Sequence, residues 1–258
     1  MLTDSHCHLD LLDLSAYDQD MHKAIAAARL KGVKYILCPG VTFEAFPNVL
    51  KIVETDDDLF ASVGVHPTED EAHQPTFGEL ISLAQNKKVV GIGETGLDFY
   101  YEKDEVKCKK QLELFKLHIQ VALELNKPLI IHAREADKEI IEVLDAEKAQ
   151  AVGGVMHCFT GGLAMAEAAL SLGFYISFSG IITFKNAENL RSIAKTVPLD
   201  KMLIETDAPY LAPTPMRGKT NEPAYLPYIA EFMAKLLDVS YESFVNQTTE
   251  NFLRFCKR

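Results

Sequence analysis

The sequence lacks the features that define several broad classes of protein. No apolar run reaches the roughly 18 residues that a membrane-spanning helix needs, and the longest apolar stretches have the length of strands. The acidic N-terminal segment, residues 1–13, has no basic stretch followed by a long apolar run, which argues against a secretory signal. No low-complexity segment or Ser/Gly-rich linker divides the chain. These absences exclude collagen-like, disordered and membrane-spanning proteins and predict no membrane partner.

Cysteine and basic residues are also few. The five cysteines are an odd number, are widely spaced and form no CxxC motif. This pattern excludes a small disulfide framework and predicts reduced thiols in a cytoplasmic protein. Lys and Arg total 26 against 37 Asp and Glu, which gives a net charge of −11. Such a balance argues against non-specific binding of polyanions, although metal ions can still hold an anionic substrate locally.

What is present is the composition of an ordinary folded enzyme, with 258 residues, 48% of them hydrophobic and 24% charged. Short β-branched runs alternate with longer amphipathic ones. The expected strands are Leu2–Asp4, Val33–Cys38, Leu59–Val65, Val89–Gly93, Pro128–His132, Ala151–His157, Phe174–Ser177 and Met202–Glu205. The first expected helix has Tyr17, Met21, Ile25 and Ala28 at helical spacing and stops at Gly32. The other expected helices are Asp104–Leu125, Met165–Leu172, Leu226–Leu237 and Tyr241–Phe255.

Eight strands alternating with helices in a chain of this length favour a single-domain α/β fold, a (β/α)8 TIM barrel spanning residues 1–258. A doubly wound open sheet is the competing fold. In a parallel barrel the C-terminal ends of all the strands open on one face, where the chemistry takes place. The polar residues that follow the expected strands are therefore the candidates for chemistry.

Candidate metal ligands follow five of the eight expected strands. They are His6 and His8, Glu94, His132, His157 and Asp207. Burying so many imidazoles and carboxylates together without a metal is costly. Six ligands also exceed the three or four that one zinc ion takes from a protein, so a carboxylate-bridged pair of divalent ions accounts for them better.

The His6-Cys7-His8 segment shows why these residue types suit a metal. In an extended chain both imidazoles lie on the same side, with Cα atoms roughly 6.6 Å apart, which suits two ligands on one ion. Taken alone, a histidine such as His132 at the end of an apolar run is more often structural than a ligand. The thiolates of Cys7 and Cys158 are alternative ligands for a soft metal, but strand alternation points them away from their neighbours' face.

The segment Gly91–Gly96 spells GxGxxG after an expected strand. A dinucleotide-binding motif opens directly into a helix, whereas Leu97–Tyr101 looks like a loop and the next expected helix begins near Asp104. Glu94 also stands where a pyrophosphate needs bare backbone. The sequence therefore disfavours nucleotide binding here. It also contains no GxSxG motif and no P-loop.

Several motifs in order closely resemble the TatD family of metal-dependent hydrolases, in particular its YcfH-like branch. The matching segments are Asp4–Asp10, Gly64–Pro67, Gly93–Asp98, His132–Arg134, His157–Gly161, Glu205–Leu211 and Asn221–Pro223. The resemblance implies a TIM barrel of the amidohydrolase-like type. It also implies that His6, His8, Glu94 and Asp207 hold one divalent ion, and that Glu94, His132 and His157 hold the other. The ions expected from this resemblance are Mg, Mn or Zn, with Glu94 bridging them.

The residue chemistry is that of a hydrolase. Two cations lower the pKa of a bound water, and Asp207 is both an expected ligand and the expected general base. His66 and Arg134 are candidate phosphate contacts, because Arg offers bidentate donors. Arg217 and Lys219, in the loop after the last strand, are two more, with an ordinary solvated loop as the alternative. Glu205 is expected only to brace that loop.

Three functions compete at this stage. The resemblance implies a deoxyribonuclease, in some members a 3′-to-5′ exonuclease on single strands, and the net charge favours a short single-stranded end over a long duplex. The second function is an ester or amide hydrolase on a small or tRNA-linked substrate, such as a D-aminoacyl-tRNA. The third, a non-catalytic metal-binding module, is disfavoured by the intact ligand set. Phe99, Tyr100, Tyr101, Phe159 and Phe184 lie in strand-end loops and either stack bases or pack. No obligate protein partner is indicated.

Overall fold

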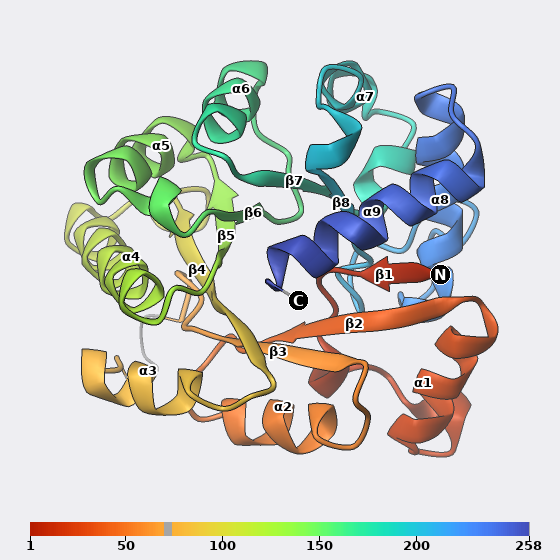
Figure 1. Cartoon of the computed structure of the whole chain (residues 1–258), viewed down its shortest axis with the longest axis horizontal. Helices are drawn as coiled ribbons and strands as arrows, with labels where there is room; N and C mark the ends of the chain where they lie inside the picture. The colour runs from red at the N-terminus through yellow and green to blue at the C-terminus, as the bar shows by residue number, and fades with distance from the viewer. Residues whose placement is uncertain (70–73, 258) are drawn as a thin grey trace. The chain divides into compact units, whose positions relative to one another are not determined.

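The computed structural model describes residues 1–69 and 74–257, and in these ranges strands alternate with helices along the whole chain (Figure 1). The strands are β1 (Leu2–Asp4), β2 (Val33–Pro39), β3 (Leu59–Val63), β4 (Val89–Asp98), β5 (Leu129–Arg134), β6 (Gly154–Met156), β7 (Tyr175–Phe178) and β8 (Met202–Ile204). The α-helices are α1 (Met21–Leu30), α2 (Phe46–Val53), α3 (Phe77–Ala84), α4 (Glu105–Leu125), α5 (Asp137–Ala146), α6 (Leu163–Ser171), α7 (Glu188–Ala194), α8 (Leu226–Leu236) and α9 (Tyr241–Phe255).

The chain divides into two compact units, and the first consists of Met1–Cys38 and Ser177–Arg258. In this unit β1 pairs with β2 in parallel. The Ser5 amide, just past β1, donates to the Ile204 carbonyl of β8 at 3.1 Å. The Glu205 amide, just past β8, donates to the Phe178 carbonyl of β7 at 3.2 Å. The strand order in the first unit is therefore β7, β8, β1, β2.

The second unit, Pro39–Ile176, contains the other run of strands. Parallel pairings join β3 to β4, β4 to β5, β5 to β6, and β6 to the start of β7. Gly40, which follows β2, donates its amide to the Ser62 carbonyl of β3 at 2.8 Å. Both runs share β2 and β7, and the order of the eight-stranded sheet follows the chain from β1 to β8. This is the strand order of a (β/α)8 barrel, which confirms the predicted fold over the doubly wound sheet.

The strands and helices differ from the sequence-based expectation mainly at their ends. Helix α9 matches its predicted bounds, and four further helices, α2, α3, α5 and α7, were not predicted. Each of the four has ten residues or fewer. Helix α3 begins with a capping box in which Thr76 and Glu79 bond reciprocally, a signal that is legible in the sequence. The prediction that residues 1–258 form a single domain stays a prediction.

The largest error in a predicted boundary is the end of β4. The strand continues five residues beyond the predicted end at Gly93. Gly93 and Gly96 have φ values of 141° and 140°, and a Cβ on either would overlap a carbonyl oxygen of β5. The register also shifts between Ile92 and Thr95, so three residues of β4 advance against two of β5. The glycines therefore permit close strand contact and a bulge, and the GxGxxG segment opens no helix that could bind a nucleotide.

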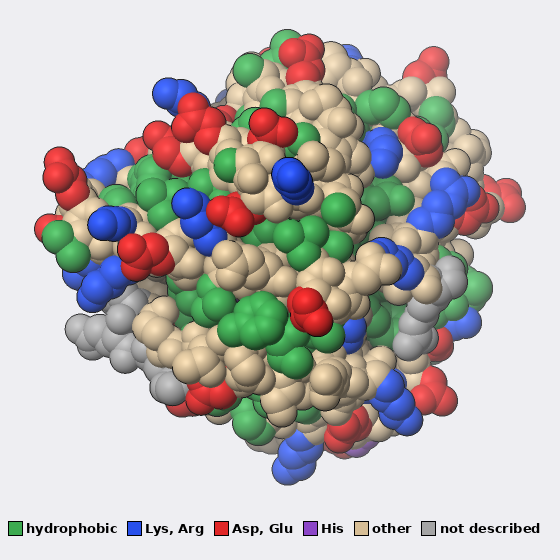
Figure 2. All heavy atoms as spheres, turned by 60° about the vertical axis from the view of Figure 1, so that its left-hand side comes forward, with side chains coloured by type: hydrophobic (Ala, Val, Ile, Leu, Met, Phe, Trp, Pro, Cys, Tyr) green, Lys and Arg blue, Asp and Glu red, His purple; other side chains and the backbone are tan. Residues whose placement is uncertain are grey.

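The surface agrees with the charge balance. On the face shown in Figure 2, acidic and basic side chains are interspersed. Within the described ranges, every helix is too short or too polar to cross a bilayer.

Candidate metal centre

The first unit brings three of the predicted ligands together. His6 and His8 follow β1, and Asp207 follows β8. Asp207 Oδ1 lies 3.8 Å from His6 Nε2 and 3.4 Å from His8 Nε2. The two imidazole centroids are 4.9 Å apart, with the rings edge to face. The prediction that the His-x-His segment places both imidazoles on one side is confirmed, and one atom from each of the three residues lies within 4.8 Å of the others.

Asp4 and Thr206 connect the two strand ends that carry this group. The buried Asp4 carboxylate accepts from the Thr206 amide at 2.9 Å and from the Thr206 hydroxyl at 2.6 Å. Burial raises the pKa of Asp4 to about 8, although the Thr206 hydrogen bonds act to lower it. The Asp207 amide donates to the His6 carbonyl at 2.9 Å, with Asp207 in the left-handed region at φ 56°. Aspartate tolerates that conformation better than most residues, which explains its place at this turn.

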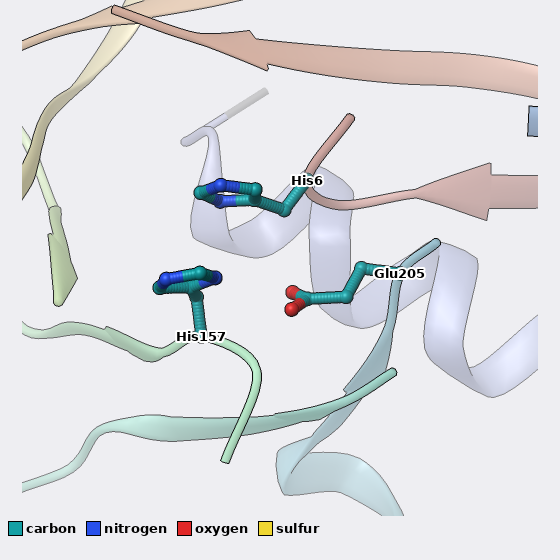
Figure 3. Close-up of side chains that lie close together, drawn as sticks. All are labelled: His6, His157 and Glu205. Atoms are coloured by element: carbon teal, nitrogen blue, oxygen red, sulfur yellow. The ribbon is translucent and has the colours of Figure 1, made fainter. Parts of the chain in front are cut away.

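Glu205 lies beside the same group. It is fully buried, and its Oε2 accepts from the Ser177 hydroxyl at 2.6 Å. Figure 3 shows the His6 and Glu205 side chains, both of the first unit, extending in the same direction from their strand ends. A carboxylate oxygen of Glu205 lies within 4.8 Å of a His6 nitrogen. Glu205 is therefore a further candidate ligand, and its expected role as a brace of the loop after β8 stays a prediction.

The second unit forms a group around one carboxylate oxygen. Glu94, in the bulged part of β4, directs Oε1 toward three imidazoles. The distances are 2.8 Å to His157 Nε2, 3.3 Å to His66 Nε2 and 3.3 Å to His132 Nδ1. Glu94 is 3% exposed. His66, predicted as a phosphate contact, therefore lies among the candidate ligands.

Two further residues orient these imidazoles. Asp98 Oδ2 lies 3.0 Å from His132 Nε2, so the ring presents Nδ1 to Glu94. The Thr68 amide donates to His66 Nδ1 at 3.3 Å, which leaves His66 Nε2 facing Glu94. A carboxylate behind an imidazole is typical of metal-binding histidines, because it fixes the tautomer and the orientation of the ring.

The pKa values reflect these contacts. Burial acts to lower the pKa of His132, but the hydrogen bonds to Asp98 and Glu94 outweigh it and raise the pKa. Burial lowers the pKa of His66. Burial acts to raise the pKa of Asp98, but its bond to His132 and its backbone hydrogen bonds bring the pKa below its usual value. The second unit thus places a carboxylate on each side of His132, Glu94 at Nδ1 and Asp98 at Nε2.

Both groups fit a divalent cation. Four ligands at about 2.0–2.2 Å in a tetrahedron lie roughly 3.3–3.6 Å from one another. The donor pairs in the first unit, at 3.4 and 3.8 Å, and two of those in the second, at 3.3 Å, are close to that spacing. Imidazole nitrogen and carboxylate oxygen suit Zn, Mn and related ions. Burial raises the pKa of the Cys7 thiol well above its ordinary value, which disfavours the alternative thiolate ligand.

The other predicted substrate contacts lie in separate places. Arg134 is the last residue of β5 in the second unit and stacks on Tyr100 and Tyr101. Arg217 and Lys219 are exposed in the loop after β8 in the first unit. The Arg217 guanidinium lies 3.9 Å above the Phe184 ring and donates to the Ala212 carbonyl at 3.1 Å.

Sequence reasoning assigned no role to Asp98 or Thr68. A signal for Asp98 exists, because Glu94, Gly96 and Asp98 alternate along β4 and residues two apart share a face. Ending the strand at Gly93 concealed that alternation. No comparable signal marks Thr68.

Comparisons with known proteins agree with the sequence motifs. A family model described as TatD related DNase matches residues 3–257. YcfH of Escherichia coli K12, named an uncharacterized metal-dependent hydrolase, is 46% identical over 98% of this chain and 94% of its own. TatD of Salmonella typhimurium, named a 3′-5′ ssDNA/RNA exonuclease, is 34% identical over 86% of this chain and 87% of its own.

The structural comparison extends over the same range. The crystal structure of YJJV, a TatD homologue from Escherichia coli K12, matches with a TM-score of 0.90 and 27% identity, and covers 98% of this chain and 97% of its own. Family model, relatives and structure all span nearly the whole chain. The chain belongs to the TatD family of metal-dependent hydrolases.

Proposed function

We propose that this protein is a two-metal phosphodiesterase that removes nucleotides from the 3′ ends of single-stranded DNA. The observation that carries the proposal is the pair of histidine–carboxylate groups at the strand ends of a TatD-family barrel. The relative named a 3′-5′ ssDNA/RNA exonuclease supports the choice of substrate. The net charge of −11 favours a short single-stranded end over a long duplex.

Both groups serve one centre in this proposal, since the C-terminal ends of barrel strands open on one face. His6, His8 and Asp207 bind one ion, His132 and His157 bind the other, and Glu94 is shared. When bound, Mg, Mn or Zn ions supply the positive charge that activates water and stabilises charge developing on phosphorus.

The chain's own residues hold the substrate and move the proton. Asp207 accepts the proton of the attacking water, because its carboxylate can take a proton while its backbone is held against His6. Arg134 contacts a phosphate oxygen through its guanidinium. His66 contributes an imidazole N–H beside Glu94, and Arg217 and Lys219 contact the strand from the loop after β8.

Turnover of labelled oligonucleotides tests this function. The protein is incubated with Mg, Mn or Zn and with a single strand labelled at the 5′ end, so that stepwise shortening reports removal of 3′ nucleotides. The matched blunt duplex and a strand blocked at its 3′ end are the controls. We expect shortening of the free single strand and little change in either control. An unchanged single strand with every metal contradicts the proposal.

The alternative is hydrolysis of a carbonyl ester, because the same donor groups suit attack on carbon. A D-aminoacyl-tRNA and a simple ester in the same metal series distinguish the two reactions. Deacylation without nucleotide release would replace the nuclease by this second function.

A further inference from the structure

Two exposed tyrosines, Tyr100 and Tyr101, lie against the guanidinium of Arg134, two residues after the candidate ligand His132. The Arg134 guanidinium lies 4.0 Å from the Tyr100 ring centroid and 4.6 Å from that of Tyr101. The two rings are edge to face with centroids 4.9 Å apart. Tyr100 is 48% exposed and Tyr101 68% exposed. The two adjacent tyrosines, on a loop between β4 and α4, therefore leave much of their rings accessible to a ligand.

The loop is fixed to the same carboxylate that orients a candidate ligand. Asp98 Oδ1 accepts from the Tyr100 amide at 3.0 Å and from the Tyr101 amide at 2.9 Å. The other oxygen of this carboxylate, Oδ2, lies 3.0 Å from His132 Nε2. The buried Gln111 side chain bonds both the amide and the carbonyl of Asp98, at 2.9 and 3.3 Å. The tyrosine pair is therefore held in a defined position relative to His132.

We propose that Tyr100, Tyr101 and Arg134 form a subsite for the terminal nucleotide of a single strand. This inference rests on the proposed function and deepens it. A tyrosine ring offers a face on which any base can stack, and Arg134 offers paired donors to the adjacent phosphate. The pairing of an aromatic surface with a guanidinium matches a nucleotide, which carries a flat base and an anionic phosphate close together.

A cavity adjoins one residue of the proposed subsite. Tyr101 lines a cavity of about 570 Å³ that also reaches Thr68, the residue that bonds His66. Tyr101 and Thr68 therefore line the same cavity. Both acidic and basic side chains line this cavity. The tyrosines and Arg134, and not the charge of the cavity, would therefore distinguish a nucleotide from other ligands.

Binding of strands with and without a terminal base tests the subsite. Fluorescence anisotropy measures the affinity of a 5′-labelled oligonucleotide that ends in a normal nucleotide, and of its twin that ends in an abasic residue. Phosphorothioate links and low temperature keep turnover slow. For the wild-type protein we expect about tenfold tighter binding of the strand with the base, the effect of one stacked base.

Variants assign that preference to the tyrosines. Tyr101→Leu should weaken binding of the normal strand about tenfold and leave binding of the abasic strand unchanged, whereas Tyr101→Phe should behave like the wild type. Tyr241→Leu, which removes an exposed tyrosine at the start of α9, is the matched control and should change neither affinity. Arg134→Gln should weaken both strands equally, because it contacts phosphate.

The outcomes separate the subsite from the reaction. Equal losses for both strands in Tyr101→Leu, or no loss in either, overturn the subsite, and so does a wild-type protein that binds neither strand. Cleavage of the unmodified normal strand is measured on the same preparations. Base-dependent binding without cleavage would contradict the proposed function and support the subsite. Cleavage without a preference for the terminal base would support the proposed function and contradict the subsite.

Discussion

The two candidate ligand groups are built in opposite ways. In the first unit, two imidazoles from one short segment approach a single carboxylate, Asp207, at 3.4 and 3.8 Å. In the second unit, three imidazoles from separate segments approach one oxygen of Glu94 at 2.8–3.3 Å. The first group depends on local chain geometry, while the second depends on several strand ends meeting. Glu94 is consequently the more central residue, and its loss should disturb more contacts than the loss of Asp207.

The supports of the two groups differ as well. In the first unit the Asp4 carboxyl group accepts from the amide and the hydroxyl of Thr206, and these bonds join the ends of β1 and β8. Asp98 and Thr68 bind the outer nitrogens of imidazoles and so fix how the rings of the second unit are turned. We therefore expect substitutions of Asp4 or Thr206 to displace the strand ends that carry the ligands of the first unit. Substitution of Asp98 should instead turn the imidazole of a ligand in the second unit.

Glu94→Ala should have the largest effect. It removes the oxygen that three imidazoles face, and in the proposed centre it is the ligand common to both ions. We expect elemental analysis to show that both ions are lost together, with turnover of the single strand abolished and the circular dichroism of the fold retained. Full occupancy by two ions would contradict the shared ligand, and loss of one ion alone would confine Glu94 to the second group.

Asp207→Asn should come next, and it tests whether the first group does more than bind metal. The amide keeps an oxygen that can coordinate but cannot accept a proton as a carboxylate does. We expect turnover at saturating Mn to fall by about 10²–10⁴-fold while bound metal changes little. A loss below about tenfold with metal retained would make Asp207 a ligand only, and the base would then be sought at His66.

The first group could be predicted from sequence because its geometry is local. Two histidines separated by one residue share a side in any extended segment, and the strand-end rule supplied Asp207. The second group was predicted only in part. Glu94, His132 and His157 follow from the same rule. His66 also directly follows the expected strand Leu59–Val65, although β3 itself ends at Val63, and it was assigned to the substrate. The rule indicates which residues meet at the strand ends, but it does not distinguish a residue that binds metal from one that binds substrate.

The errors in the bounds of β4 and in the number of helices have a common physical origin. Gly93 and Gly96 resemble a strand end in sequence, yet they allow β4 to approach β5 and continue to Asp98. The four helices missed are short, and their stability comes from packing on the sheet more than from their own propensity. Tertiary contacts decided both features, whereas the alternation of strands and helices alone favours an α/β fold and leaves the barrel and the doubly wound sheet to be distinguished by strand order.

His118 sharpens the comparison by separating a structural histidine from the candidate ligands of the second unit. It lies on α4, fully buried, where Nε2 accepts from the Val65 amide at 3.1 Å and Nδ1 donates to the Leu114 carbonyl at 2.8 Å. Burial lowers its pKa from 6.5 to about 4. The neutral ring therefore stabilises the fold fully above pH 6.5, and that contribution is lost as the pH falls toward 4, because the unfolded chain takes up the proton first.

His118→Gln tests this, since the amide can replace both hydrogen bonds without titrating. The free energy of unfolding, measured in urea with chelator present, should fall about 3 kcal/mol further for the wild type than for the variant between pH 7 and 4. Taking the difference cancels the titration of groups common to both proteins. Parallel curves would show that His118 does not titrate with the fold.

Asp98→Asn should have the smallest effect and probes ring orientation most directly. An asparagine oxygen can still accept from the Tyr100 and Tyr101 amides, but its NH₂ meets His132 Nε2 where the carboxylate stood. Support of this kind is typically worth about 10–100-fold in metal affinity or activity. We expect a loss in that range for the ion of the second group alone, measured by calorimetric titration.

Asp98→Ala distinguishes the two roles of this residue, since it removes the loop contacts as well as the carboxylate. It should lose metal affinity to a similar extent, and it should also lose the preference for a terminal base that Asp98→Asn keeps. Wild-type metal affinity in Asp98→Asn would mean that His132 holds its orientation without a carboxylate. The two ligand groups would then still differ in the chain segments that supply their residues. They would no longer differ in their supports, because the Asp98 carboxylate would not be needed to orient an imidazole of the second group.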